Sequence, residues 1–333
     1  MFKPMQRLFL SAALLSATAF GASHAADLKE LNFGIISTES SQNLKTIWDP
    51  FLADMSKMTG MKINAFFAPD YAGIIQGMRF NKVDVAWYGN KSAMEAVDRA
   101  GGEIFAQTVA ANGNAGYWSL LITHKSSPLN SVEDMLKNAK SLTFGNGDPN
   151  STSGFLVPSY YVFAKNNVDP AQIFKRTLNA SHEVNGLSVA NKQVDVATFN
   201  SEAMERLQVT RPEKASELKV IWTSPLIASD PIVWRKNLPQ ETRNKIDNFF
   251  KTYGSTSEQM KVLAALQWGK FRKSDDDQLL PIRQLELFKQ RSKISADTNM
   301  TAGEKAGKLK EIDASLEKLS ARMSSLDKAA KAG

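Results

Sequence analysis

The sequence predicts an α/β protein built from two hinged lobes and ending in C-terminal helices. Short apolar runs alternate with helical segments in two successive sets, which is typical of parallel sheets covered by helices. The second set repeats a feature of the first, because residues 191–199 resemble residues 81–88 with one inserted Gln. Two segments, residues 117–123 and 223–230, connect the sets, so we expect a hinge made of two crossings.

The first set begins with a strand at residues 31–36. A helix follows, in which apolar residues recur near a 3.6-residue period through residues 44–55. Strands at residues 62–67 and 83–87 are separated by a second helix, which begins after a turn at residues 68–71. Open α/β sheets bind ligands beyond the carboxyl ends of their strands. We therefore expect the ligand site in the cleft between the lobes.

The second set and the segments after it follow the same logic. Strands are expected at residues 141–144, 174–178, 219–222 and 231–234. Helices are expected at residues 155–164, 182–191, 240–253 and 257–266. Pro158 lies a few residues into the first of these helices. Its missing N–H should interrupt the hydrogen-bond ladder there, after a short first turn.

A last helix is predicted from residue 301 to residue 330. Its apolar residues are spaced by three or four positions, as in the seam of a coiled coil. They are Leu309, Ile312, Leu316, Leu319, Met323 and Leu326. Packing of this seam on its own domain and pairing with another chain fit the pattern equally well.

Residues 1–25 are predicted to be a secretory signal peptide. Lys3 and Arg7 precede an apolar run at residues 8–20, and the segment ends in Ala25 at a small-residue cleavage site. The run is too short to span a bilayer. The sequence has no Cys, so neither a lipid anchor near the cleavage site nor a disulfide is expected. We expect an exported, soluble protein.

The formal net charge is +7, but the basic residues are scattered and form no run typical of a nucleic-acid-binding arm. A basic balance mildly favours the capture of anions. Ordinary solvation of the surface is the simpler explanation. We therefore expect no nucleic-acid partner.

One turn, between residues 144 and 155, has the composition of an anion site. It places Ser151, Thr152 and Ser153 at the start of a predicted helix. The first N–H groups of a helix lack intrahelical partners, and its dipole gives that end a partial positive charge. A tetrahedral oxyanion could bind there without Lys or Arg. A capped helix after a Ser-rich turn is the alternative that this segment alone leaves open.

Catalytic and metal chemistry are harder to place on this chain. Ser151, Ser153, His182 and Asp148 could supply a hydrolase triad, but no Gly-x-Ser-x-Gly or Ser-x-x-Lys motif surrounds these serines. Without Cys, and with only His124 and His182 after the signal peptide, a transition-metal site is not expected. No Walker-type loop is present. We expect no enzyme, no metal and no cofactor. An exported oligomerisation scaffold would leave the Ser151 turn unexplained.

Other polar residues are candidates for contact with a ligand. Tyr71 opens a helix of the first lobe, opposite the Ser151 turn, although it could serve packing alone. His182 could simply cap its own helix. Glu202 and Asp230 are residue types that more often lie at the solvated surface.

Four runs of the sequence closely resemble the periplasmic phosphonate-binding protein of phosphonate ABC transporters. They are residues 31–40, 64–84, 143–154 and 230–235, and the similarity extends over nearly the whole mature chain. This resemblance implies a type II periplasmic binding protein, whose two lobes close on an alkylphosphonate, typically 2-aminoethylphosphonate. It also implies delivery of the ligand to a membrane permease.

The same resemblance assigns roles to particular residues. Ser151, Thr152 and Ser153 would bind the phosphonate oxygens. Tyr71, Tyr117 and His182 would assist them. Glu202 and Asp230 would hold the ammonium group of the ligand. If the two acids are spectators, the ligand would instead be phosphate, phosphite or a phosphate ester.

The resemblance also implies a division of the chain. Lobe one is expected to comprise residues 26–121 and 226–290, and lobe two residues 122–225. Residues 291–333 would form a C-terminal helical extension. In this family such helices can mediate dimerisation, which suits the apolar seam of the last helix.

Overall fold

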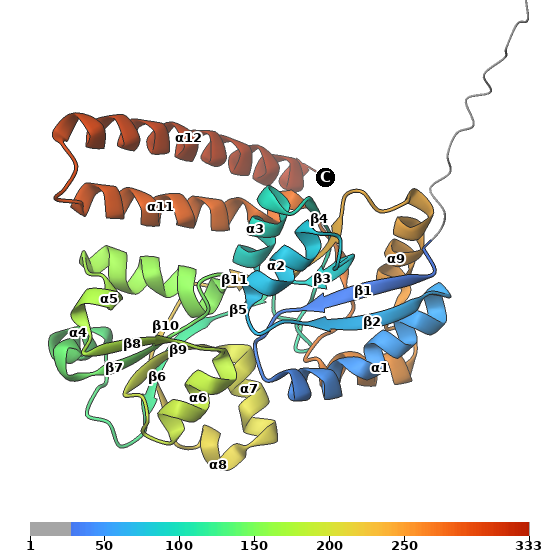
Figure 1. Ribbon diagram of the computed structural model, residues 1–333, viewed down its shortest axis with the longest axis horizontal. Coiled ribbons are helices and arrows are strands. Elements are labelled where there is room, and N and C mark those ends of the chain that lie inside the picture. The colour runs from blue at the N-terminus through green and yellow to red at the C-terminus, as the bar shows by residue number, and fades with distance from the viewer. Residues whose placement is uncertain (1–27, 333) are drawn as a thin grey trace, which may run out of the picture.

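The computed structural model describes residues 28–332, and its two lobes and C-terminal helices are shown in Figure 1. The predicted signal peptide, residues 1–25, lies outside the described residues. Between residues 28 and 332, no helix combines the length and the apolar character needed to cross a membrane.

Lobe one is built on a six-stranded sheet with the order β13-β4-β12-β3-β1-β2. Its strands are β1 (Glu30–Ile35), β2 (Lys62–Phe67), β3 (Val85–Trp87), β4 (Gly102–Gln107), β12 (Pro231–Arg235) and β13 (Arg272–Lys273). β1 is parallel to β2 and β3, whereas β12 runs antiparallel between β3 and β4. Its helices are α1 (Ser41–Thr59), α2 (Tyr71–Arg79), α3 (Asn90–Arg99), α9 (Gln240–Thr252) and α10 (Ser257–Ala265). Because α1, α2 and α3 each follow a parallel strand, their N-termini meet at one edge of the sheet.

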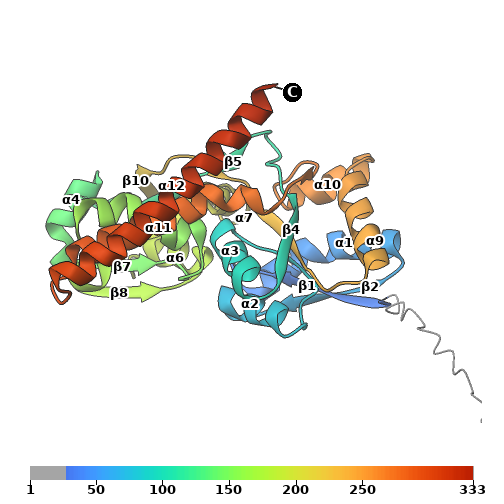
Figure 2. The ribbon, with the colours of Figure 1, turned by 90° about the horizontal axis from the view of Figure 1, so that it is seen from above.

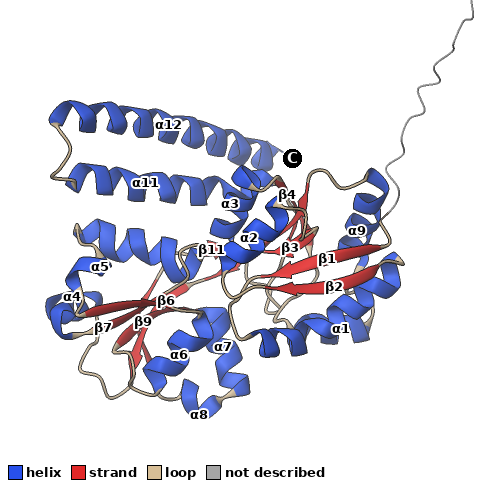
Figure 3. Ribbon diagram, viewed as in Figure 1, coloured by secondary structure: helices blue, strands red, loops and turns tan. Residues whose placement is uncertain are grey.

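Lobe two is built on a five-stranded sheet with the order β10-β6-β9-β7-β8. Its strands are β6 (Ser119–His124), β7 (Thr143–Asn146), β8 (Arg176–Asn179), β9 (Val196–Asn200) and β10 (Leu218–Thr223). Its α-helices are α4 (Val132–Asn138), α5 (Pro170–Ile173), α6 (His182–Ala190), α7 (Ser201–Thr210) and α8 (Pro212–Ala215). Figure 3 shows the two sheets side by side, each with helices against it.

The lobes are joined by two crossings that pair with each other. β5 (Gly116–Tyr117) and β11 (Ile227–Ala228) form a short antiparallel ribbon. A Cβ on Gly116 would lie 1.8 Å from the carbonyl oxygen of Ile227, so only glycine allows this approach. The predicted crossing at residues 117–123 is wrong over most of its length. Residues 119–124 are fully buried and pair with β9 and β10, as a central strand of lobe two.

The aromatic core of lobe one explains why its helices pack where they do. Trp48 and Phe51 on α1 contact Phe33 on β1, and Phe51 also meets Phe249 on α9 edge-on. All four side chains are essentially buried. Burying one such side chain contributes about 1.5–3 kcal/mol. This cluster therefore ties the N-terminal strand to a helix some two hundred positions later in the chain.

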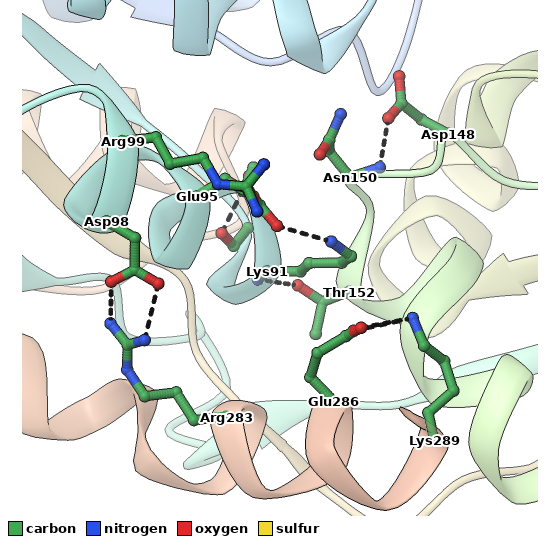
Figure 4. Close-up of polar contacts among 12 residues, drawn as sticks. Lys91, Glu95, Asp98, Arg99, Asp148, Asn150, Thr152, Arg283, Glu286 and Lys289 are labelled. Atoms are coloured by element: carbon green, nitrogen blue, oxygen red, sulfur yellow. Dashed lines mark hydrogen bonds and ion pairs between the residues drawn. The ribbon is translucent and has the colours of Figure 1, made fainter. Parts of the chain in front are cut away.

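The C-terminal residues form a helical hairpin, α11 (Leu280–Ala296) and α12 (Ala302–Ala332). Arg283 on α11 pairs with both carboxylate oxygens of Asp98 on α3, at 2.8 and 2.6 Å (Figure 4). Arg291 pairs with Asp313 at 2.7 Å and links the two helices. Viewed from above in Figure 2, the hairpin lies over both lobes.

Several expectations about individual elements are corrected. The helix predicted at residues 155–164 is largely two π-helical stretches, Thr152–Leu156 and Ser159–Phe163. Pro158 therefore does not end the helix after a short first turn, because the wider turns continue past it. The expected lobe boundary at residues 121–122 falls inside β6, and the boundary at 290–291 falls inside α11. We place these divisions before β6 and before α11 instead, as a proposal.

Candidate functional site

All eight residues predicted to contact the ligand line one cavity between the lobes. They are Tyr71, Tyr117, Ser151, Thr152, Ser153, His182, Glu202 and Asp230. The cavity has a volume of about 50 Å³, which suits a small molecule.

The turn after β7 presents backbone N–H groups and hydroxyls to the cavity. Ser151 caps the helix, since its Oγ accepts a hydrogen bond of 2.9 Å from the N–H of Gly154. The first bond of the helix joins the N–H of Leu156 to the carbonyl of Ser151, five residues back, at 3.1 Å. Such π-turns are frequent at functional sites. The helix start therefore has the character of an anion site.

The three hydroxyl oxygens of this turn each accept a hydrogen bond from the protein. Ser151 Oγ accepts from the N–H of Gly154, as described above. Thr152 Oγ1 accepts from the backbone N–H of Lys91 at 2.8 Å, a contact drawn in Figure 4. Ser153 Oγ accepts from the side-chain amide of Asn200 at 3.1 Å. A hydroxyl has one proton to donate, and none of these three bonds uses it.

His182 stands beside Ser153 as an uncharged ring. Its Nε2 lies 3.4 Å from Ser153 Oγ and 3.3 Å from Asn200 Nδ2. Burial lowers the pKa of His182 to about 4, so the ring is neutral at pH 7. Its Nδ1 has no hydrogen-bond partner among the described residues.

The two tyrosines of the cavity come from lobe one and from the hinge, and both are uncharged. Tyr71 is the first residue of α2, and Tyr117 belongs to β5. Burial raises the pKa of both phenols well above the ordinary value. Each therefore remains a hydrogen-bond donor at neutral pH. The Tyr117 hydroxyl donates to Asp230 Oδ1 at 3.1 Å.

Two acidic side chains face the cavity, and burial raises the proton affinity of both. Burial raises the pKa of Asp230 well above its ordinary value, and the charge of Glu202 raises it further. Burial also raises the pKa of Glu202 to about 7, against the opposing effect of Arg206. Two carboxylates held together out of water favour protonation or a cationic partner. The acids thus form a site suited to a positive charge.

The sequence argument missed several residues that line the same cavity. Asn200 follows directly from the strand of the internal repeat, so its position at a carboxyl strand end was a usable signal. Arg206 is the only Lys or Arg among the described residues that line the cavity, and its Nε pairs with Glu39 Oε1 at 2.8 Å. Trp48 and Trp87 form part of the apolar wall. No sequence motif marks them.

The geometry disfavours a hydrolase. His182 lies near Ser153, but no carboxylate orients its other ring nitrogen within the described residues. Asp148, the residue proposed for that role, accepts from the backbone N–H groups of Tyr71 and Asn150 at 3.1 and 2.7 Å. A nucleophilic triad needs that third group to hold the histidine tautomer. Residues 28–332 also contain no group of three His, Cys, Asp or Glu that could hold a metal ion.

Comparison with known proteins decides the family. The sequence profile of the ABC transporter, phosphonate, periplasmic substrate-binding protein family matches residues 33–279. The chain belongs to this family. The receptor is 62% identical over 304 residues to the phosphonates-binding periplasmic protein of Escherichia coli K12, covering 91% of this chain and 90% of that protein.

A solved structure agrees with this assignment. The binding protein component of an ABC phosphonate transporter from Pseudomonas aeruginosa superposes with a TM-score of 0.89 at 71% identity. The match covers 90% of this receptor and all of that chain. A more distant relative, a phosphate-import protein of Mycolicibacterium smegmatis, is 27% identical over 230 residues, 66% of this chain and 70% of its own.

These matches confirm several of the expectations from sequence. The fold is that of a type II periplasmic binding protein with two α/β lobes. The receptor is the periplasmic phosphonate-binding component of an ABC transporter. Its relatives are substrate-binding proteins, so it is not an enzyme.

Proposed function

We propose that this receptor captures 2-aminoethylphosphonate and delivers it to the transporter's permease. The observation that carries the proposal is the polarity of one small cavity. The lining of this cavity contains neutral hydrogen-bond donors around the Ser151 turn. It also contains two carboxylates with raised pKa values, Glu202 and Asp230. A ligand with an anionic head and an ammonium group complements both groups of residues.

The phosphonate end of the ligand would bind at the Ser151 turn. Ser151, Thr152 and Ser153 each accept a hydrogen bond from the protein, and each would donate its one hydroxyl proton to the ligand. Tyr71, Tyr117 and His182 would add neutral groups around the remaining oxygens. Hydrogen bonds to an ionised group contribute about 1.5–3 kcal/mol each, so several of them can hold an anion without a cation.

The ammonium end would bind between Glu202 and Asp230. An ionised carboxylate that is buried without a cationic partner costs several kcal/mol. For this reason burial raises the pKa of both acids. An ammonium group removes that cost. Simple phosphate does not, so the receptor would reject it partly through this penalty.

A receptor for phosphate, phosphite or a phosphate ester is the second candidate. The relationship to a phosphate-import protein favours it. In that case Glu202 and Asp230 would be protonated spectators beside an inorganic anion.

Isothermal titration with three ligands separates the candidates. We expect 2-aminoethylphosphonate to bind most tightly, methylphosphonate more weakly because it has no amine, and phosphate most weakly. Equal affinity for phosphate and 2-aminoethylphosphonate would show that the assignment of the amine pocket is wrong.

Two further features of the proposal concern export and assembly. We infer that residues 1–25 are removed as a signal peptide after export. We also infer a homodimer through the C-terminal helices. The 31 residues of α12 exceed the 17 of α11, so at 1.5 Å per residue α12 extends about 20 Å further than α11. Met323 and Leu326 are only half-buried on that projecting part, where a second copy could cover them.

A further inference from the structure

At the N-termini of three helices of lobe one, backbone N–H groups donate hydrogen bonds to side chains of lobe two. Glu183 Oε2 accepts from the N–H of Ser40, the N-cap of α1, at 2.8 Å. Asp148 accepts from Tyr71 at the start of α2, and Thr152 accepts from Lys91 at the start of α3. Because the N–H groups there have no intrahelical partners, lobe two satisfies donors that lobe one leaves open.

Glu183 makes the most extensive of these contacts. Besides Ser40, it accepts a hydrogen bond of 2.7 Å from the side-chain amide of Asn43. Its own backbone N–H donates to the carbonyl of Thr38 at 3.2 Å. Arg211 lies 3.6 Å from the same carboxylate, whose side chain is only 14% exposed. Three bonds thus join one residue of lobe two to the loop between β1 and α1 and to the first turn of α1.

The charge of Glu183 also complements α1. This 19-residue helix has no acidic residue in its first turn, although a negative charge there is favoured by the helix dipole. Glu183 supplies that charge from the other lobe. When the lobes separate, the carboxylate returns to water and α1 loses its anionic partner.

Glu183 is next to a ligand-site residue on the same turn of α6. His182, the preceding residue, lines the cavity beside Ser153. Movement that brings His182 to a ligand held by both lobes also brings Glu183 to α1. Glu183 itself does not line that cavity.

We propose that Glu183 is a positioning residue that sets affinity for every ligand of this cavity by stabilising the closed arrangement of the lobes. If binding requires the closed form, the apparent dissociation constant equals the intrinsic one divided by the fraction of closed protein. Losing charged hydrogen bonds to Ser40 and Asn43 should lower that fraction. We expect an affinity loss of about tenfold in Glu183→Ala, by the same factor for each ligand.

The test is a titration of wild type and Glu183→Ala with 2-aminoethylphosphonate and with methylphosphonate. Equal losses for the two ligands support the proposal, whereas unchanged affinities, or a loss for one ligand alone, overturn it. Glu213→Ala, which removes an exposed acid of the same lobe, is the matched control and should bind as wild type does. Only the choice of ligand rests on the proposed function. If wild type prefers phosphate, the same comparison is made with phosphate.

Two further measurements separate positioning from general damage. In a double-mutant cycle, Asn43→Ala should weaken binding in wild type and add little in Glu183→Ala, because both substitutions break one contact. Additive losses would overturn the proposal. Small-angle scattering at one sub-saturating ligand concentration, near the wild-type dissociation constant, should show a smaller contraction for Glu183→Ala, because less of the variant is bound and closed. Its ligand-free melting temperature should stay that of wild type. An equal contraction at that concentration would count against the role. If the melting temperature of Glu183→Ala is below that of wild type, the same titrations are made with Asn43→Ala, which changes lobe one only.

Discussion

Thr152 on lobe two accepts a hydrogen bond of 2.8 Å from the backbone N–H of Lys91 on lobe one. This bond connects the anion turn of one lobe to the start of α3 in the other. The hydroxyl that receives it also faces the cavity. Thr152 therefore joins the two lobes and, as we propose, also donates to the ligand.

Thr152→Val should weaken binding of every phosphonate by about 10- to 100-fold. The substitution keeps the shape of the side chain but removes the acceptor for Lys91 and the donor for the ligand, and a hydrogen bond to a charged group contributes about 1.5–3 kcal/mol. Titration with 2-aminoethylphosphonate and methylphosphonate measures the loss. Thr152→Ser retains the hydroxyl and should stay close to wild type. Equal losses in both variants would contradict the role of the hydroxyl.

Glu202→Gln should weaken 2-aminoethylphosphonate much more than methylphosphonate. The amide keeps the size of the side chain but removes the charge that we assign to the ammonium group. The ratio of the two affinities, measured by titration, isolates the amine. Glu213→Gln, which changes an exposed acid on α8 outside the cavity lining, is the control. The same fractional loss for both ligands would remove Glu202 from the amine pocket.

The affinity for 2-aminoethylphosphonate should rise with pH more steeply than the affinity for methylphosphonate. Burial raises the pKa of Glu202 to about 7 and raises that of Asp230 as well. An ammonium ligand favours the ionised acids, so its binding releases protons below those pKa values. One group of pKa about 7 changes the ratio of affinities up to roughly tenfold between about pH 6 and about pH 8.

Titrations in buffers of different ionisation enthalpy count the protons released. Methylphosphonate corrects for the titration of the phosphonate itself, and Glu202→Gln should flatten the difference between the ligands. Parallel pH profiles for the two ligands in wild type would show that the acids do not meet the amine.

Gly147→Ala should destabilise the protein and disturb the anion turn. A Cβ there would lie 2.5 Å from the backbone carbonyl group of Gly154. It would force apart the 3.0 Å bond between Gly147 N–H and the Gly154 carbonyl. Overpacking of this kind costs about 1–3 kcal/mol, measured as a lower midpoint in urea. Gly307→Ala on α12 meets no atom within 4 Å and should be neutral or stabilising by about 1 kcal/mol. A Gly147→Ala variant of wild-type stability would contradict the geometry.

Deleting residues 301–333 should convert a dimer to a monomer without changing ligand affinity. Ile312 packs into the hairpin at 8% exposure, but Met323 and Leu326 are only half-buried, as expected of a surface that another copy covers. Light scattering coupled to size exclusion gives the mass of both forms. A full-length protein that is already monomeric would show that α12 serves only its own chain.

The alternation of strands and helices was predictable because hydrophobic periodicity is a local property. β2 (Lys62–Phe67) has the predicted bounds, and the helix starts at His182 and Gln240 were also predicted. The place of β12, antiparallel between β3 and β4, was not. Its pairing joins segments more than a hundred residues apart, and no local pattern specifies such a register.

The candidate site also separates what local sequence predicts from what it does not. A strand-to-helix turn rich in hydroxyls, which is a local signal, predicted Ser151, Thr152 and Ser153 as ligand residues. The roles of the other five predicted residues came from a resemblance. Arg206 and Asn200 were missed because their roles depend on partners from distant segments, Glu39 for one and Ser153 for the other.

The sequence by itself determined two α/β lobes and a helix start with three successive hydroxyl residues, Ser151 to Ser153, which we propose as the anion site. These follow from spacing, from composition and from the chemistry of a helix start. Only the tertiary structure decided that Glu183, Asp148 and Thr152 of one lobe would cap three helices of the other. It also decided that Glu202 and Asp230 would line the same buried cavity. The physical reason is that burial and charge coupling depend on which surfaces meet when the chain folds back across its hinge.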